Sequence, residues 1–194
     1  MHAPTPETLA TVARLLRAGG VAVIPTDTVY GIAAHPACAS AVARIGTIKG
    51  RPTDKPIALL ASDADAATAF GAAFPPAAQR LASAFWPGAL TLVLPCGPTC
   101  EGFRVPDHAF TRRLLAASGG TLRVTSANLS GAMPAVSAVD ALKDVGLEAD
   151  LVIDGGVSPG GVASTVVKVE ADNTFTVLRE GAIPTADILR AANR

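Results

Sequence analysis

The chain has 194 residues, of which 49% are hydrophobic and 16% are charged. This length suggests one domain, and the apolar content argues against disorder over most of the chain, because enough side chains are present to form a core. Acidic and basic residues number 16 each. The zero net charge argues against a protein that coats nucleic acid through bulk electrostatics.

Targeting and membrane signals are absent from the sequence. No apolar run approaches the roughly 18 residues of a membrane span, and residues 1–7 lack the basic and apolar regions of a signal peptide. Cys38, Cys96 and Cys100 do not form paired C-x-x-C clusters, so we expect free thiols rather than a zinc site or a disulfide framework. These features predict a cytoplasmic protein without membrane contact.

The predicted elements alternate between helices and strands. Residues 7–17 have helical apolar spacing that ends at Gly19-Gly20, and the continuous apolar run 21–24 fits a buried strand. Further helices are predicted over residues 39–48, 63–73, 77–85, 107–117, 137–145 and 186–192, and further strands over residues 57–61, 90–94, 103–105, 122–125, 151–153, 165–169 and 175–178. Asp172-Asn173 predicts a hairpin turn between the last two strands. The mixture indicates an α/β or α+β sheet protein.

Two loops are candidates for mobile segments, residues 95–102 and the glycine-rich residues 155–161. Glycine permits positive φ and close backbone approach. Such loops often close over a ligand, although a plain connector is the more frequent case.

Cations follow a hydroxyl-rich turn in the first third of the chain. The predicted strand 21–24 runs into the turn 25–31, and Lys49, Arg51 and Lys55 follow the next predicted helix. Donors and positive charge at one end of a sheet indicate an anion site. The alternative is that cations at a helix C-terminus complement the helix dipole.

A second polar segment, Ser126-Ala127-Asn128, follows an apolar strand. Ligands bind outside the carboxyl ends of strands in α/β proteins, although serine and asparagine are also common turn residues. The sequence has no P-loop, no G-x-G-x-x-G fingerprint and no G-x-S-x-G elbow.

Seven motifs, taken together and in order, resemble the YrdC/TsaC/Sua5 family of threonylcarbamoyl-AMP synthases. They are Pro25–Gly31, Lys49-Gly-Arg-Pro52, Lys55-Pro56, Trp86-Pro-Gly88 before Leu90–Leu94, Arg104-Val-Pro106, Ser126–Gly131 and Ser164–Val167. The resemblance covers about residues 20–181. It implies a single YrdC-like domain over residues 1–194, in the short form, with a twisted open mixed sheet flanked by helices and a concave, positively charged cavity.

The resemblance also implies an activity. The family's enzymes convert L-threonine, bicarbonate and ATP into L-threonylcarbamoyladenylate and diphosphate, the first step of t6A synthesis at position 37 of tRNA. ATP is then a substrate, and Mg²⁺ is expected with its phosphates. The expected partners are threonylcarbamoyl-transfer proteins of the TsaB, TsaD and TsaE type as product acceptors, with tRNA or dsRNA as a further contact.

The family's functional residues carry over to matching positions of this chain. The catalytic set is Lys49, Arg51, Ser126 and Asn128. The ATP contacts are Arg51, Lys55, Ser126, Asn128 and Arg179, and the threonine contacts are Thr28, Arg104 and Ser164. Charge accumulates on phosphoryl oxygens during adenylation, which suits Lys49 and Arg51, while Arg104 suits a bidentate grip on the threonine carboxylate.

Some positions depart from the family pattern. Leu60 stands where many relatives carry a histidine that helps to hold threonine, and Cys100 stands where relatives often carry threonine. The segment 131–134 is one residue longer than usual, which makes Val136 and Ser137 candidates for the next ligand position, and neither is assigned a role.

Two alternatives to the synthase remain. The first is a carbamoyl-adenylate-handling relative, like the YrdC-like domain of the hydrogenase-maturation protein HypF, although no C-x-x-C pair of that protein's zinc-finger segments is present. The second is a dsRNA-binding or tRNA-binding module, for which the neutral charge and 4% aromatic content are unfavourable.

Overall fold

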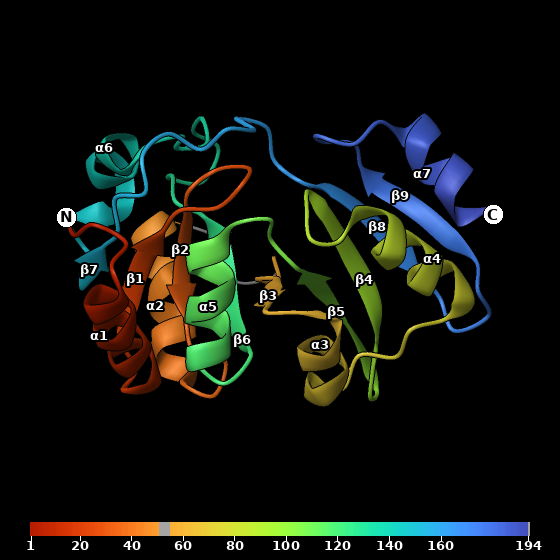
Figure 1. Cartoon of the computed structure of the whole chain (residues 1–194), viewed down its shortest axis with the longest axis horizontal. Helices are drawn as coiled ribbons and strands as arrows, with labels where there is room; N and C mark the ends of the chain where they lie inside the picture. Colours follow the sequence, from red (N-terminus) through yellow and green to blue (C-terminus); the bar gives the residue numbers. More distant parts are fainter. Residues whose placement is uncertain (51–54, 194) are drawn as a thin grey trace.

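A twisted nine-stranded mixed sheet runs through the part of the chain that the computed structural model describes, residues 1–50 and 55–193 (Figure 1). The strands lie in the order β7-β1-β2-β6-β3-β5-β4-β8-β9. Their bounds are β1 Val21–Ile24, β2 Gly31–Ala34, β3 Leu59–Ala61, β4 Leu90–Cys96, β5 Thr99–Arg104, β6 Thr121–Ser126, β7 Leu151–Val152, β8 Thr165–Val169 and β9 Phe175–Arg179. Three pairs are parallel, β1 with β7, β3 with β5 and β4 with β8, and the other pairs are antiparallel.

Several helices begin at residues whose side chains accept hydrogen bonds from backbone amides of the first turn. Thr5 accepts from the Thr8 amide and Asp63 accepts from the Ala66 amide, as N-caps do. Ser137 caps its helix in the same way, as predicted. The bounds are α1 Pro6–Arg17, α2 Ala39–Lys49, α3 Ala64–Phe70, α4 Pro76–Phe85, α5 Ala109–Ala117, α6 Ala138–Ala141 and α7 Thr185–Ala192, with a π-helical turn over Leu142–Gly146.

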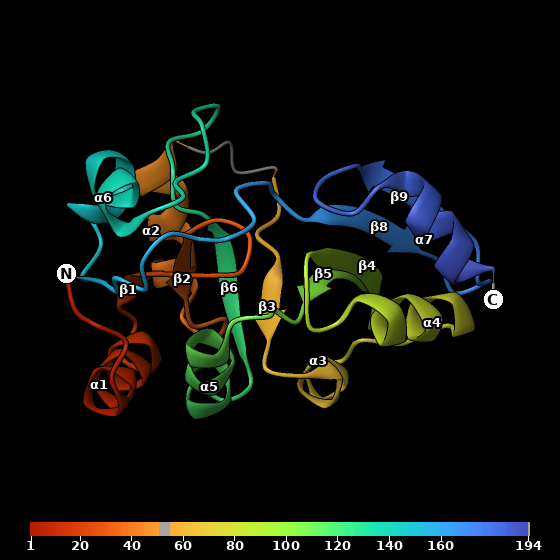
Figure 2. The same ribbon diagram turned by 45° about the horizontal axis from the view of Figure 1, so that its top comes forward.

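These helices cover the two faces of the sheet unequally (Figure 2). Helices α1, α5, α3 and α4 lie on one face, whereas α2 and α6 lie on the other face at the β7-β1-β2 end. Helices α4 and α7 bury apolar side chains together with β4 and β8. Among the described residues, no helix covers the opposite face of β5, β4 and β8, so that face is available for a ligand.

The alternation of side chains along β4 decides which residues reach the uncovered face. Leu90, Leu92 and Leu94 are buried in the core with α4. Because successive strand residues point to opposite faces, Thr91 and Val93 point the other way, where they line a cavity.

The structure corrects three sequence-based expectations. Strand β2 was not predicted, because its sequence Gly-Ile-Ala-Ala has only one β-branched residue. The segment 95–102, predicted as a mobile loop, mostly belongs to the hairpin of β4 and β5, which turns at Gly97 with φ of 57°. Helix α5 begins at Ala109 rather than at residue 107, because His108 is its N-cap.

Two other expectations, on the cysteines and on the turn at Asn173, are confirmed. Cys38, Cys96 and Cys100 are free thiols. Asn173, with φ of 73°, lies in the turn between β8 and β9. Within the described residues, every helix is too short or too polar to cross a membrane.

Candidate functional site

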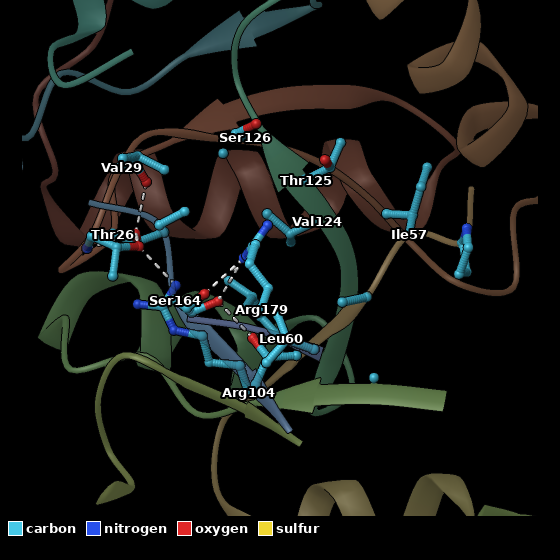
Figure 3. Close-up of a pocket in the computed structure, with 18 of the residues that line it drawn as sticks. Thr26, Val29, Ile57, Leu60, Arg104, Val124, Thr125, Ser126, Ser164 and Arg179 are labelled. Carbon is cyan, nitrogen blue, oxygen red and sulfur yellow. Dashed lines mark hydrogen bonds between the residues drawn. The ribbon is translucent and has the colours of Figure 1, made fainter. Parts of the chain in front are cut away.

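A cavity of about 420 Å³ lies on the uncovered face of the sheet (Figure 3). Its polar lining residues are Thr26, Thr28, Tyr30, Thr91, Cys100, Arg104, Thr125, Ser126, Ser164 and Arg179. Residues 56–58 and several aliphatic side chains complete the wall. No aspartate or glutamate lines the cavity among the described residues, so its lining favours an anionic ligand.

Arg104, at the end of β5, is buried at the cavity wall and donates to three acceptors. Its Nε donates to the Gly88 carbonyl at 2.9 Å, Nη1 to Thr28 Oγ1 at 2.7 Å, and Nη2 to Asp27 Oδ1 at 2.5 Å. Burial lowers the pKa of Arg104, and Asp27 opposes that effect, whereas nearby Arg179 lowers the pKa further. Asp27 therefore supplies the counter-charge of this buried guanidinium.

Arg179, at the end of β9, is the second cation of the cavity. It donates to the Ser164 carbonyl at 2.7 Å, and burial lowers its pKa. The Ser164 hydroxyl lies 2.8 Å from Thr91 Oγ1 on β4. The parallel pairing of β4 with β8 brings these residues together, because it places Leu90 opposite Thr165.

The turn 25–31 forms another wall and is stabilised from within. Thr26 Oγ1 donates to the Val29 carbonyl at 2.7 Å and accepts from the Thr28 amide at 3.1 Å. The Tyr30 hydroxyl donates to the Gly156 carbonyl at 2.6 Å. Burial raises the pKa of Tyr30, which keeps the hydroxyl protonated as a donor.

The glycine-rich loop 155–161 packs directly on this turn. Gly160 donates its amide to the Asp27 carbonyl at 3.1 Å, and Gly161 donates to the Thr28 carbonyl at 2.9 Å. Ser158 Oγ donates to the Thr26 carbonyl at 2.9 Å. The loop predicted as a mobile candidate is thus hydrogen-bonded to the turn that carries Thr28.

Lys49 lies at the C-terminal end of α2, behind the cavity wall, and is only 3% exposed. Its ammonium group donates to the Ser126 carbonyl at 2.5 Å and to the Asn128 carbonyl. These bonds connect α2 to the segment that follows β6, and they hold Ser126 at the cavity.

Asn128 is also buried, beside Lys49. Its Nδ2 donates to the carbonyls of Leu129 and Ala132, at 2.8 and 2.9 Å. Its Oδ1 is buried with no partner among the described residues. Because an unsatisfied buried acceptor is costly, a ligand donor that reached Oδ1 would stabilise the site.

The structure brings most of the expected site residues together. Those that line the cavity are Thr28, Arg104, Ser126, Ser164 and Arg179, and the departures Leu60 and Cys100 line it as well. Asn128 belongs to the segment after β6 and its carbonyl accepts from Lys49, and Lys55 precedes Pro56 of the cavity wall. Arg51 lies outside the described residues. Val136 and Ser137 are not among the cavity residues, and the Ser137 hydroxyl instead caps α6.

Sequence reasoning missed two residues of the site. Asp27 was not named as a site residue and entered only as part of the turn 25–31, although its carboxylate pairs with Arg104 across 77 positions of the chain. Thr91 was not singled out, although the alternation of leucine and other residues over 90–94 places it on the face opposite the core.

Residues 14–181 match the family model Sua5_yciO_yrdC, described as "Telomere recombination". The chain belongs to this family. It is 36% identical over 186 residues to the threonylcarbamoyl-AMP synthase of Bacillus subtilis. The match covers 90% of this chain and 54% of that protein. It is also 36% identical to a putative threonylcarbamoyl-AMP synthase of Mycobacterium tuberculosis, over 89% of this chain and 83% of that protein.

A solved structure of the same family has the same fold. The crystal structure of P. abyssi Sua5 complexed with L-threonine superposes with a TM-score of 0.89 and 31% identity, over 95% of this chain and 57% of that one. The chain thus spans about half the length of the B. subtilis and P. abyssi proteins.

Proposed function

We propose that this chain is a threonylcarbamoyl-AMP synthase, which converts L-threonine, bicarbonate and ATP into L-threonylcarbamoyladenylate and diphosphate. The observation that carries the proposal is a cavity with two arginines, Arg104 and Arg179, and no acidic side chain among its described lining residues. Membership of the family supports the choice of reaction, because relatives bear this name and the P. abyssi structure contains L-threonine.

At the threonine end, Arg104 would bind the α-carboxylate, while Thr28 and Ser164 would supply hydroxyl groups. All three lie at one wall of the cavity. An arginine suits this task because its planar fork matches the two oxygens of a carboxylate.

At the nucleotide end, Ser126, Asn128 and Arg179 would bind ATP together with Arg51 and Lys55. The threonine amine and bicarbonate combine with loss of water to a carbamate, and a carbamate oxygen then attacks the α-phosphorus as pyrophosphate leaves. Negative charge grows on the phosphoryl oxygens. Arg51 would stabilise this negative charge at the phosphates. Lys49 would also stabilise it, and would in addition fix the segment that carries Ser126.

A magnesium ion would enter with the nucleotide. The described residues contain no group of three or more His, Cys, Asp or Glu side chains that could hold a metal ion. Phosphate oxygens are common Mg²⁺ ligands and leave the ion several waters, so the protein need not supply an acidic cage.

The product would serve tRNA modification in the cytoplasm. A mixed carbamic-phosphoric anhydride is reactive, so its acceptor must take it promptly. We expect threonylcarbamoyl-transfer proteins of the TsaB, TsaD and TsaE type to use it for t6A at position 37 of tRNA, with tRNA as a further contact.

The test is pyrophosphate release from ATP by the purified chain, with L-threonine and bicarbonate each present or omitted. Release that requires both substrates, with the adenylate detected by mass spectrometry, is the expected result. Release that does not depend on threonine, or no release, would refute the proposal.

A further inference from the structure

The carboxylate of Asp27 contacts Arg104 but does not belong to the cavity lining. Thr26, Thr28 and Arg104 line the cavity, whereas Asp27 does not. The ion pair is nevertheless buried, with side-chain exposures of 8% for Arg104 and 12% for Asp27. Asp27 therefore contacts Arg104 without lining the cavity that a ligand would occupy.

We propose that Asp27 is a positioning residue that orients the Arg104 guanidinium for the α-carboxylate of the amino-acid substrate. The proposal rests on the function proposed above, in which Arg104 binds threonine. It adds a residue that touches no substrate atom and acts only through Arg104.

Three acceptors hold the guanidinium of Arg104 in place. A guanidinium has five N–H groups, and Gly88, Thr28 and Asp27 each accept one, from three different nitrogens. Acceptors on all three nitrogens fix the plane of the group. One N–H on each terminal nitrogen has no acceptor among the described residues, and such a pair is what a bidentate carboxylate contact requires.

The backbone of Asp27 is held in place by the loop 155–161. The Gly160 amide donates to the Asp27 carbonyl at 3.1 Å. A Cβ at position 160 would lie only 2.7 Å from that carbonyl oxygen, so the close approach depends on glycine. The loop 155–161 thus holds the backbone from which the Asp27 carboxylate extends.

Asp27 can affect threonine binding in two ways, through the position of its oxygen and through its negative charge. Its charge compensates the buried guanidinium, yet the same charge repels a substrate carboxylate. If orientation dominates, an amide oxygen at the same position should preserve binding, whereas a longer carboxylate should not. The ordering of three substitutions therefore separates the two effects.

The experiment measures L-threonine binding by calorimetry for the full chain and for Asp27→Ala, Asp27→Asn and Asp27→Glu. We expect Asp27→Ala to weaken threonine binding about tenfold or more, since a charge-assisted hydrogen bond is lost. Asp27→Asn should stay within about threefold and should bind threonine more tightly than Asp27→Glu, because its oxygen stays in place. ATP binding should remain within about twofold in every folded variant.

Asp107→Asn is the matched control, because Asp107 is exposed and forms no ion pair with Arg104. It should bind threonine as the unchanged chain does. Wild-type affinity in Asp27→Ala, tighter binding in Asp27→Glu than in Asp27→Asn, or an equal loss of threonine and ATP binding would each overturn the proposal. If Asp27→Ala does not fold, the comparison of the asparagine and glutamate variants still decides it.

A second readout separates this inference from the proposed function. The NMR resonance of the Arg104 Nε–H, assigned by its loss in Arg104→Lys, reports the orientation of the group without any substrate. It should persist in Asp27→Asn and shift or broaden in Asp27→Glu. If the resonance behaves in this way while the unchanged chain binds no threonine, the orienting role of Asp27 stands and the proposed substrate fails. An unchanged resonance in Asp27→Glu refutes the orienting role.

Discussion

Lys49 shows how a single residue can serve a site without lining it. Its ammonium is buried and donates to two backbone carbonyls of the segment after β6. The sequence placed Lys49 near an anion site, but backbone acceptors leave no pattern in a sequence, so its partners could not be predicted. The phosphate role that the family resemblance implies stays a prediction.

Replacing Lys49 by methionine should reduce stability by about 1–3 kcal/mol, because the Ser126 and Asn128 carbonyls lose their charged donor. Urea unfolding measures the change. Lys55→Met is the control, since Lys55 is exposed, and it should stay within about 0.5 kcal/mol. Equal stability of the two variants would mean that the Lys49 contacts contribute little to the fold.

Arg179 tests the nucleotide end of the cavity. Arg179→Ala should raise the KM for ATP by about tenfold, because the cavity loses one of the two guanidinium groups among its described lining residues. The KM for threonine should change less. Steady-state pyrophosphate release measures both constants, with exposed Arg113→Ala on α5 as the control. A selective rise in the KM for threonine would place Arg179 at the other substrate.

At the scale of elements, the site depends on the contact between the turn 25–31 and the loop 155–161. The two segments lie far apart in the sequence, and several hydrogen bonds join them. The turn contributes Thr28, and the loop leads into Ser164. A change in either segment should therefore affect the cavity wall.

Gly160→Ala should separate these two segments, because a Cβ would approach the Asp27 carbonyl oxygen to 2.7 Å. We expect a loss of about 1–3 kcal/mol of stability, together with weaker threonine binding. Gly46→Ala in α2 is the matched control, since nothing lies within 4 Å of its added Cβ. That control should stabilise the chain by up to about 1 kcal/mol. Wild-type threonine affinity in Gly160→Ala would show that the contact is not needed for the site.

The sequence predicted most helices and strands, because their apolar spacing and caps are local signals. Strand β2 escaped because alanine fits a strand only where neighbours bury it, and β1 and β6 flank β2 on both sides. For the site, the family resemblance identified Thr28, Arg104, Ser126, Ser164 and Arg179 as candidates, and all five line the cavity. The Asp27 ion pair could not be predicted, since it depends on strand order.

At the scale of the whole molecule, the half-buried His108 links protonation to folding. His108 Nδ1 accepts from the Thr111 amide at the start of α5. Burial lowers the pKa of His108 below its ordinary value of 6.5, while Asp27 and Asp107 oppose the shift. The unfolded chain therefore binds this proton more readily than the folded one, and stability rises with pH through this range.

Unfolding free energy should accordingly fall between about pH 7 and about pH 5.5. His108→Asn should reduce this slope, because asparagine caps a helix without titrating there. Urea unfolding of the unchanged chain and of His108→Asn, each at both pH values, tests this expectation. An equal slope in both would assign the pH dependence to other groups.

The uncovered face of the sheet has a consequence for how the chain matures. Its cavity is lined by residues of the turn after β1, by residues of β4 and β5, and by residues at and just before the start of β8. Arg179 comes from β9, which follows every other strand in the described part of the chain. A nascent polypeptide cannot complete this wall until β9 has left the ribosome. Substrate binding should therefore report that the sheet has folded through β9, and a bound nucleotide should protect the native chain from proteases.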